Sequence, residues 1–242
     1  MIDRTNERQG PGGEWLPDVA SASDQFWQKN ELLVADGFLG AEALAPMIAE
    51  ADRLRAKINR NFVPRIKKGG SVSYFDVMRD APAILAFYRS PEFITWLSAI
   101  TREPLLVCPD NDPHACALYY YTEAGDHIGF HYDTSFYRGK RYTVLLGLVE
   151  QSSSRLVCEV FKDDPTRATE TRSVHTVPGT LVMFNGDKLW HAVTPSAAGE
   201  DRVVLSMEYV TDQRMSQLNR IVSNVKDAVA YFGIRSLFRG KR

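Results

Sequence analysis

The sequence predicts an all-β core flanked by helices, in a single domain of the α+β class. Six short runs rich in Val, Leu, Tyr and Thr lie between positions 115 and 210, and Gly, Pro, Asp and Ser separate them. This alternation of strand and turn residues is typical of an antiparallel sandwich or barrel. Upstream of position 101, apolar residues recur mainly at three- and four-residue steps, which indicates helices. A chain of 242 residues is long enough for one large domain.

Composition limits the class of protein. Hydrophobic residues make up 44% of the chain and charged residues 24%, which is ordinary for a globular protein with a packed core. The formal net charge is −1, so the overall positive field of non-specific nucleic-acid binding is missing. Three cysteines form no CxxC motif, which favours a reducing, cytoplasmic location. No apolar run has the length of a membrane span or the position of a secretion signal.

The N-terminal part is expected to contain a tail, a strand and two helical segments. Residues 1–23 mix charges, three glycines and two prolines without periodicity, so we expect a disordered tail there and a domain over 24–242. Residues 31–39 are consistent with a short strand. Apolar residues over 41–58 follow helical spacing, and a second helical stretch covers about 81–101.

A basic stretch crosses the end of the first predicted helix. Between Arg53 and Lys68 there are seven basic residues and no acidic one. Such a run is usually a solvated helix face and loop, and this is the interpretation we adopt. Contact with phosphates or with an acidic partner is the alternative.

Strands and a final helix are expected in the second half of the chain. The predicted strands cover 115–121, 141–149, 155–161, 172–177, 179–184 and 202–210. After Asp212, apolar residues return to helical spacing up to Phe232, which predicts a C-terminal helix. The basic end of the chain, 234–242, has the composition of a segment that rests on an anionic membrane surface, but a helix packed on the core is the preferred interpretation.

Two motifs point to a metal site. His131 and Asp133 are two residues apart in the segment Gly-Phe-His-Tyr-Asp. In an extended segment such residues point to the same face, so an imidazole and a carboxylate can reach one ion. His191, which follows a polar turn at a strand edge, would complete the two-histidine, one-carboxylate triad of non-haem iron(II). By itself HxD is a weak signal, since its usual role is a cap or a loop hydrogen bond.

A basic residue follows the second histidine. Arg202 lies eleven residues beyond His191, and strand alternation places it on one face with Ser206 and Glu208. A buried guanidinium needs an anion, and a dicarboxylate cosubstrate held by its far end would provide one. The alternative is a surface arginine paired with a neighbouring acidic residue.

Taken in order, these pieces resemble the iron(II)- and 2-oxoglutarate-dependent dioxygenases over about residues 115–211. The matching segments are YYYTEAGDHIGFHYD, KRYTVLLGL, VPGTLVMFNGDKLWHAVTPSAAGEDR and VVLSMEYV. They are similar to the tyrosine strand, HxD turn, core strand, distal-histidine strand and arginine strand of the prolyl-hydroxylase-like branch. The opening ELLVADGFLGAEAL is also similar to how many members begin. The resemblance implies a double-stranded β-helix, or jelly roll, flanked by N-terminal and C-terminal helices.

The resemblance also implies roles for individual residues. His131, Asp133 and His191 would bind iron(II), and Arg202 would bind the C5 carboxylate of 2-oxoglutarate. The candidate hydroxyl donors to the cosubstrate are Tyr119, Tyr121, Thr143 and Ser206. Packing in the β core is the alternative for at least one of the tyrosines. The implied activity uses O2 to hydroxylate an unactivated C–H bond of a small molecule, for example an amino acid.

Departures from the family pattern reduce the number of substrate classes that the resemblance allows. The segment EQSSSRLVC replaces the glycine-pair segment of prolyl hydroxylases, which puts a peptidyl-proline substrate in doubt. Nucleic-acid demethylases of the superfamily carry a second arginine six residues after the first, where this chain has Glu208. In related halogenases the ligand aspartate is glycine, so Asp133 favours hydroxylation.

Three further residues are candidates for substrate contact. Glu208 suits a cationic substrate, with a structural salt bridge as its alternative. His127 and His114 lie in polar segments near the predicted site, where a histidine is usually just solvated, and His175 is expected to be structural. Two other functions stay open: a nucleobase or protein side-chain oxygenase or demethylase of the same superfamily, and a non-catalytic jelly-roll protein that binds a metal.

Overall fold

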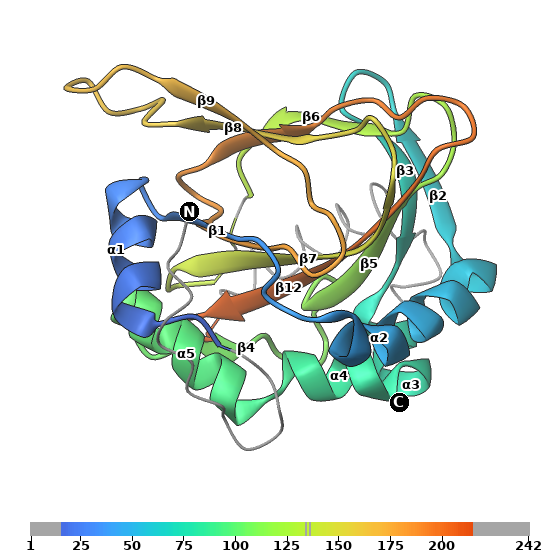
Figure 1. Cartoon of the computed structure of the whole chain (residues 1–242), viewed down its shortest axis with the longest axis horizontal. Coiled ribbons are helices and arrows are strands. Elements are labelled where there is room, and N and C mark those ends of the chain that lie inside the picture. Colours follow the sequence, from blue (N-terminus) through green and yellow to red (C-terminus); the bar gives the residue numbers. More distant parts are fainter. Residues whose placement is uncertain (1–15, 134, 136, 215–242) are drawn as a thin grey trace.

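The computed structural model describes residues 16–133, 135 and 137–214. Within these residues, antiparallel strands form one sheet that curls back on itself, and the helices lie together along one side of it (Figure 1). The strand order is β1-β10-β7-β12-β5-β3-β6-β11-β8-β9, with β2 beside β3 and β4 beside β12. The predicted antiparallel β core with accompanying helices is therefore confirmed.

The structure contains strands and helices with the following bounds. The strands are β1 (Leu32–Ala35), β2 (Asn59–Val63), β3 (Lys67–Val72), β4 (Leu106–Val107), β5 (Cys116–Tyr121), β6 (His127–His131), β7 (Arg141–Gln151), β8 (Leu156–Val160), β9 (Glu170–Val174), β10 (Leu181–Asn185), β11 (Trp190–Val193) and β12 (Asp201–Val210). The helices are α1 (Val19–Gln28), α2 (Ala41–Leu54), α3 (Tyr74–Asp80), α4 (Pro82–Tyr88) and α5 (Pro91–Thr101), and a 3₁₀ turn (Arg55–Lys57) follows α2.

The long neighbouring strands β7 and β12 lie between two apolar clusters. On β12, Val203, Leu205, Met207 and Tyr209 belong to the outer cluster, which lies between the sheet and the helices. The inner cluster consists of strand and loop side chains and lies inside the curled sheet; among its buried members are Tyr121, Leu156, Cys158, Val160, Val182, Phe184, Leu189 and Val193. Strand β12 is buried on both faces, but only its outer face is continuously apolar, because its inner face carries Arg202, Ser206 and Glu208.

Local sequence explains where several helices begin. The side chains of Asp18 and Ser90 accept backbone N–H hydrogen bonds at the starts of α1 and α5. Pro82 and Pro91 occupy the first turns of α4 and α5, where a missing N–H costs nothing. The helical stretch predicted over 81–101 is therefore two helices, because Pro91 cannot continue the hydrogen bonding of α4. Among the described helices, none is long and apolar enough to cross a membrane.

The predicted tail over residues 1–23 is wrong at its C-terminal end. Helix α1 begins at Val19, and the hydroxyl of Ser23 donates a hydrogen bond to the carbonyl of Ile100. The apolar residue that anchors this helix, the fully buried Phe26, lies beyond the predicted tail, so the composition of the tail alone did not reveal it. Residues 1–15 and the predicted C-terminal helix and basic end lie outside the described residues.

Arg53 lies on helix α2 as predicted, but most of the basic stretch forms a β-hairpin where the sequence predicts a loop. After the 3₁₀ turn, β2 and β3 pair with each other, and β3 joins β5 to β6. Five of its seven basic residues pair with acidic side chains of the same chain: Arg53, Arg55, Lys57, Arg60 and Lys68. Most of the charge of this stretch is therefore compensated within the protein.

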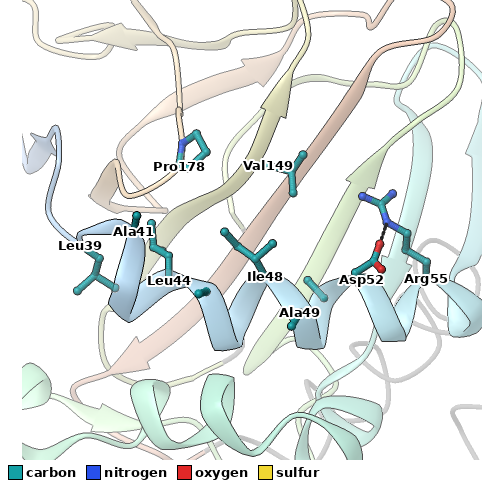
Figure 2. A pocket seen from close by; sticks show the side chains of 11 residues that line it. Leu39, Ala41, Leu44, Ile48, Ala49, Asp52, Arg55, Val149 and Pro178 are labelled. Atoms are coloured by element: carbon teal, nitrogen blue, oxygen red, sulfur yellow. Dashed lines mark hydrogen bonds and ion pairs between the residues drawn. The ribbon is translucent and has the colours of Figure 1, made fainter.

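A pocket of about 550 Å³ lies between α2 and β7, on the outer side of the sheet (Figure 2). Apolar side chains line most of it, and the ion pair of Asp52 and Arg55 lies at one end. The lining residues are Leu39, Ala41, Leu44, Ala45, Ile48, Ala49, Ala51, Asp52, Arg55, Val149 and Pro178. None of them is a predicted site residue, so this pocket is distinct from the candidate metal centre.

Candidate metal centre

The three predicted metal ligands come from two strands and a loop. His131 ends β6 and pairs with His191 of β11 across the antiparallel ladder, and Asp133 follows two residues later. Nε2 of His131 lies 3.3 Å from Oδ1 of Asp133, and Nε2 of His191 lies 3.8 Å from the same oxygen. The potential ligand atoms of the three residues all lie within 4.8 Å of one another. The structure thus brings the HxD motif and the distal histidine together.

Backbone carbonyls orient both imidazoles. Nδ1 of His131 is 2.9 Å from the carbonyl of Gly129, and Nδ1 of His191 is 2.9 Å from the carbonyl of Leu189. Because a carbonyl oxygen only accepts, each Nδ1 carries the hydrogen and donates it. The other ring nitrogen, Nε2, is left with a lone pair directed at the centre, which is the arrangement a metal-binding histidine needs.

Asp133 is held by the turn between β10 and β11 and by strand β7. Its backbone N–H donates to the carbonyl of Gly186, and its Oδ2 accepts a hydrogen bond of 2.7 Å from the hydroxyl of Thr143. A Cβ atom at position 186 would lie 2.6 Å from the Cβ of Asp133, so only glycine allows this approach. Oδ1 is thereby left to face the two imidazoles.

The protonation states suit a cation. Burial opposes ionisation of Asp133, but the imidazoles of His191 and His131 and the guanidinium of Arg141 outweigh it and hold the pKa of this carboxyl well below its usual range. Burial lowers the pKa of His191, despite the nearby carboxylate of Asp133. A carboxylate and neutral imidazoles are the forms in which these side chains bind metal, so the donor set fits a divalent ion.

A buried polar chain extends from Asp133 to the end of β12. The Thr143 hydroxyl lies 2.7 Å from Asp133 and 3.0 Å from Oε2 of Glu208, and Arg141 Nε donates to that same oxygen of Glu208 at 2.9 Å. Burial raises the pKa of Glu208 to about 7, although Arg141 opposes the shift. Glu208, a candidate for recognising a cationic substrate, is thus already engaged by a cation of this chain.

Arg202 is buried rather than on the surface, with a relative exposure of 1%. Its Nε lies 3.2 Å from Oε2 of Glu150, its Nη2 donates to the hydroxyl of Thr176 at 3.0 Å, and its guanidinium lies 4.9 Å from the ring centre of Tyr121. Nη1 is buried and has no hydrogen-bond partner among the described residues. Glu150 thus supplies the anion that a buried guanidinium requires, and one donor, Nη1, remains available.

The predicted hydroxyl donors have different surroundings. Tyr121 is buried beside Arg202, and burial raises its pKa to about 12 in spite of that guanidinium. Tyr119 is partly buried against the same inner cluster, as strand alternation predicts. Ser206 lies on β12 with its hydroxyl 3.5 Å from Oε1 of Glu208.

The remaining histidines lie apart from the triad contacts. The ring of His114 is 3.4 Å from the hydroxyl of Tyr119, so it reaches a residue of the inner face. Nδ1 of His127 is 2.8 Å from the carbonyl of Gly125, within its own turn. His175 has a half-exposed side chain 3.8 Å from Glu150.

Sequence reasoning missed several residues of this interior. Thr176 and Glu150, which contact Arg202, carried no motif. Gly186 belongs to an Asn-Gly turn that signals a tight bend but not its contact with Asp133. Lys67 belongs to the stretch for which the sequence predicts solvent exposure, but its relative exposure is 2%.

Comparisons with known proteins find relatives by structure only. No protein-family model matches the chain, and no curated protein sequence matches it. Among solved structures, the non-haem alpha-ketoglutarate-dependent epimerase SnoN from nogalamycin biosynthesis has a TM-score of 0.65 and 16% identity, over 79% of this chain and 80% of its own. A Pseudomonas putida prolyl-4-hydroxylase has a TM-score of 0.60 and 18% identity, over 81% of this chain and 100% of its own. An oxidoreductase of the 2OG-Fe(II) oxygenase family from Burkholderia pseudomallei has a TM-score of 0.59 and 15% identity, over 87% and 97%. These similarities confirm the predicted jelly-roll fold.

Proposed function

We propose that the protein, which has the fold of the iron(II)- and 2-oxoglutarate-dependent oxygenases, is an enzyme of this class that hydroxylates an unactivated C–H bond of a small molecule. The observation that carries the proposal is the convergence of His131, Asp133 and His191, whose potential ligand atoms lie within 4.8 Å of one another. Two imidazoles and one carboxylate form the facial triad of non-haem iron(II), which leaves coordination positions for a cosubstrate and O2.

Iron(II) with 2-oxoglutarate and O2 would supply the oxidising power, and the cosubstrate would leave as succinate and carbon dioxide. The chain's own groups position and shield these partners. His131, His191 and Asp133 would hold the iron, and Thr143 fixes the orientation of Asp133. The apolar side chains of the inner cluster exclude water from the space beside them.

Arg202 is the proposed anchor for the far carboxylate of 2-oxoglutarate. Its buried Nη1, without a hydrogen-bond partner among the described residues, would be satisfied by a carboxylate oxygen. Tyr119 and Tyr121 are the proposed hydroxyl donors near it, and Ser206, four residues further along β12, is a third proposed donor to the cosubstrate. Both tyrosines lie on the inner face of β5, next to β12.

Two observations support a small molecule over a nucleic acid as the substrate. Most basic residues between Arg53 and Lys68 are paired with acidic groups of this chain, so they offer little charge to phosphates. Glu208, at the position where nucleic-acid demethylases carry a second arginine, forms a buried ion pair with Arg141. Because that carboxylate is engaged, a contact with a substrate amine is not part of the proposal. Retention of Asp133 supports hydroxylation as the outcome.

The first experiment measures uncoupled turnover of 2-oxoglutarate to succinate with iron(II) and O2. We expect succinate from the wild-type protein and a loss of at least 100-fold in His131→Ala, because one of three metal ligands is removed. His175→Ala, which removes a half-exposed imidazole outside the triad, is the matched control and should retain turnover.

The outcomes separate the proposal from its alternative. If the wild-type protein binds iron but forms no succinate, the fold serves as a non-catalytic metal-binding protein. If His131→Ala turns over 2-oxoglutarate at the wild-type rate, the assignment of the triad is wrong.

A further inference from the structure

Lys67 is a buried basic residue that the proposed function does not use. Its relative exposure is 2%, and burial lowers the pKa of its ammonium group well below the usual value. Removing an ammonium group from water is costly, so a lysine is rarely fully buried in a protein unless its charge is compensated. The neighbouring Lys68 side chain points to the other face of the strand. Its ammonium group donates a hydrogen bond of 2.7 Å to the carbonyl of Ala124 at the protein surface.

The side chain of Lys67 faces the interior of the curled sheet. Strand β3 bridges β5 and β6, and it places Lys67 opposite Ile128, which packs against the inner cluster. The ammonium nitrogen lies 4.9 Å from the ring centre of Tyr119, a favourable cation–π distance. Gly69, the next residue of β3 on the same face, has no side chain to obstruct the path of Lys67 toward that ring.

Strand pairing places Lys67 between the metal-binding residue His131 and the proposed cosubstrate anchor Arg202. Its partner Ile128 lies three residues before His131 on β6, or about 10 Å along the strand at ~3.3 Å per residue. On the other side, Gly70 of β3 pairs with Tyr120 of β5, and Tyr121 of β5 pairs with Arg202 of β12. Lys67 and Arg202 therefore lie on strands that flank the two inward-facing tyrosines.

Charge balance separates the roles of the two basic residues. The side chain of Glu150 is fully buried, lies 3.2 Å from Arg202 and accepts hydrogen bonds from the backbone N–H and the hydroxyl of Ser152. The charge of Arg202 is therefore already compensated inside the protein. A further carboxylate placed against this neutral pair would be a buried, uncompensated negative charge, which is strongly unfavourable.

Building on the proposed function, we propose that Lys67 binds the far carboxylate of 2-oxoglutarate together with Arg202. Lys67 supplies the compensating positive charge, and Nη1 of Arg202 supplies a directed hydrogen bond. The carboxylate would lie over the tyrosines of β5, between β3 and β12. In this arrangement the cosubstrate carboxylate lies between the ammonium group of Lys67 and the guanidinium of Arg202, which Glu150 also contacts.

The test is a binding measurement by calorimetry on full-length protein loaded with Mn²⁺, without turnover. It compares wild-type protein, Lys67→Met and the matched control Lys68→Met, each titrated with 2-oxoglutarate and with 2-oxobutyrate, a 2-oxo acid that lacks the far carboxylate. We expect Lys67→Met to weaken 2-oxoglutarate binding roughly 10- to 150-fold, the range of a charge-assisted contact, and to leave 2-oxobutyrate binding unchanged. Lys68→Met should match the wild type with both ligands.

Stability of the ligand-free protein provides a second readout. Methionine has nearly the length of lysine without its charge, so Lys67→Met should fold and melt at or above the wild-type temperature. Wild-type 2-oxoglutarate affinity in Lys67→Met, while the wild-type protein itself binds 2-oxoglutarate, would overturn the role of Lys67 and leave the proposed function standing. Absence of 2-oxoglutarate binding by the wild-type protein would overturn both.

Discussion

At each histidine of the triad, a backbone carbonyl two residues earlier in the chain fixes the ring. Gly129 and Leu189 accept the Nδ1 hydrogens, so both Nε2 atoms face Asp133 before any ion binds. Preorganised ligands lose little freedom on binding a metal, which favours affinity. The sequence motif alone could name His131 and Asp133, because their spacing is local. The choice of ring nitrogen depended on backbone positions that only the folded strands define.

A substitution of Thr143 tests whether its hydrogen bond to Asp133 contributes to iron binding. The Thr143 hydroxyl lies 2.7 Å from Asp133 and 3.0 Å from Glu208, so it separates a partly buried carboxylate from a buried one. Thr143→Val keeps the shape of the side chain and removes the hydroxyl. We expect iron(II) affinity to fall roughly 10- to 100-fold, the usual effect of losing a group that orients a metal ligand. Thr171→Val, on an exposed part of β9, is the control. Unchanged iron affinity in Thr143→Val would show that Asp133 does not need this hydrogen bond.

A local irregularity in β7 explains why the partner of Arg202 escaped prediction. Strict alternation from the inward-facing Thr143 would place Glu150 on the outer face. The register between β12 and β7 shifts between Val203 and Val204, so that Glu150, and not Val149, lies opposite Arg202 and faces the interior. A β-bulge of this kind moves later side chains to the other face. The inward face of β12 was predictable because that strand alternates regularly.

Substitutions of Arg202 and Glu150 test whether the bulge in β7 brings the two side chains together as a buried ion pair. Arg202→Met leaves Glu150 buried without its cation, and such a loss costs about 3–5 kcal/mol of unfolding free energy. Adding Glu150→Met removes the uncompensated charge as well, so the double variant should recover most of that stability. Urea unfolding measures both. A single variant as stable as the wild type would mean that the two side chains do not form a buried ion pair.

Strand β3 is not predicted by the sequence, because its own residues do not favour a strand. Its sequence, Lys-Lys-Gly-Gly-Ser-Val, has low strand propensity and follows a basic run. The strand exists because it is paired on both edges: β2 pairs with residues 67–71 along one edge, and β6 and β5 pair in turn with the other edge. Gly70 is favoured there because an added Cβ would lie 2.5 Å from the side chain of Ile58. Tertiary pairing of this kind is not visible in local sequence.

Across the described molecule, one curled sheet performs two tasks with its two faces. The outer face packs on the helices, and the inner face carries apolar side chains together with Arg202, Glu150 and Lys67. The overall architecture was predictable from strand periodicity and motif order, because both repeat along the chain. The balance of buried charges was not, because it depends on residues that are far apart in sequence and carry no motif.

The measurement that tests the central claim most directly is an anaerobic titration of the protein with iron(II) in the presence of 2-oxoglutarate, followed by visible absorption. We predict about one iron bound per chain and a charge-transfer band that requires both iron and 2-oxoglutarate, because the triad leaves positions open for the cosubstrate. His191→Ala should lose the band, since it removes a ligand that faces Asp133. A wild-type protein without the band, or a His191→Ala variant with the full band, would contradict the account.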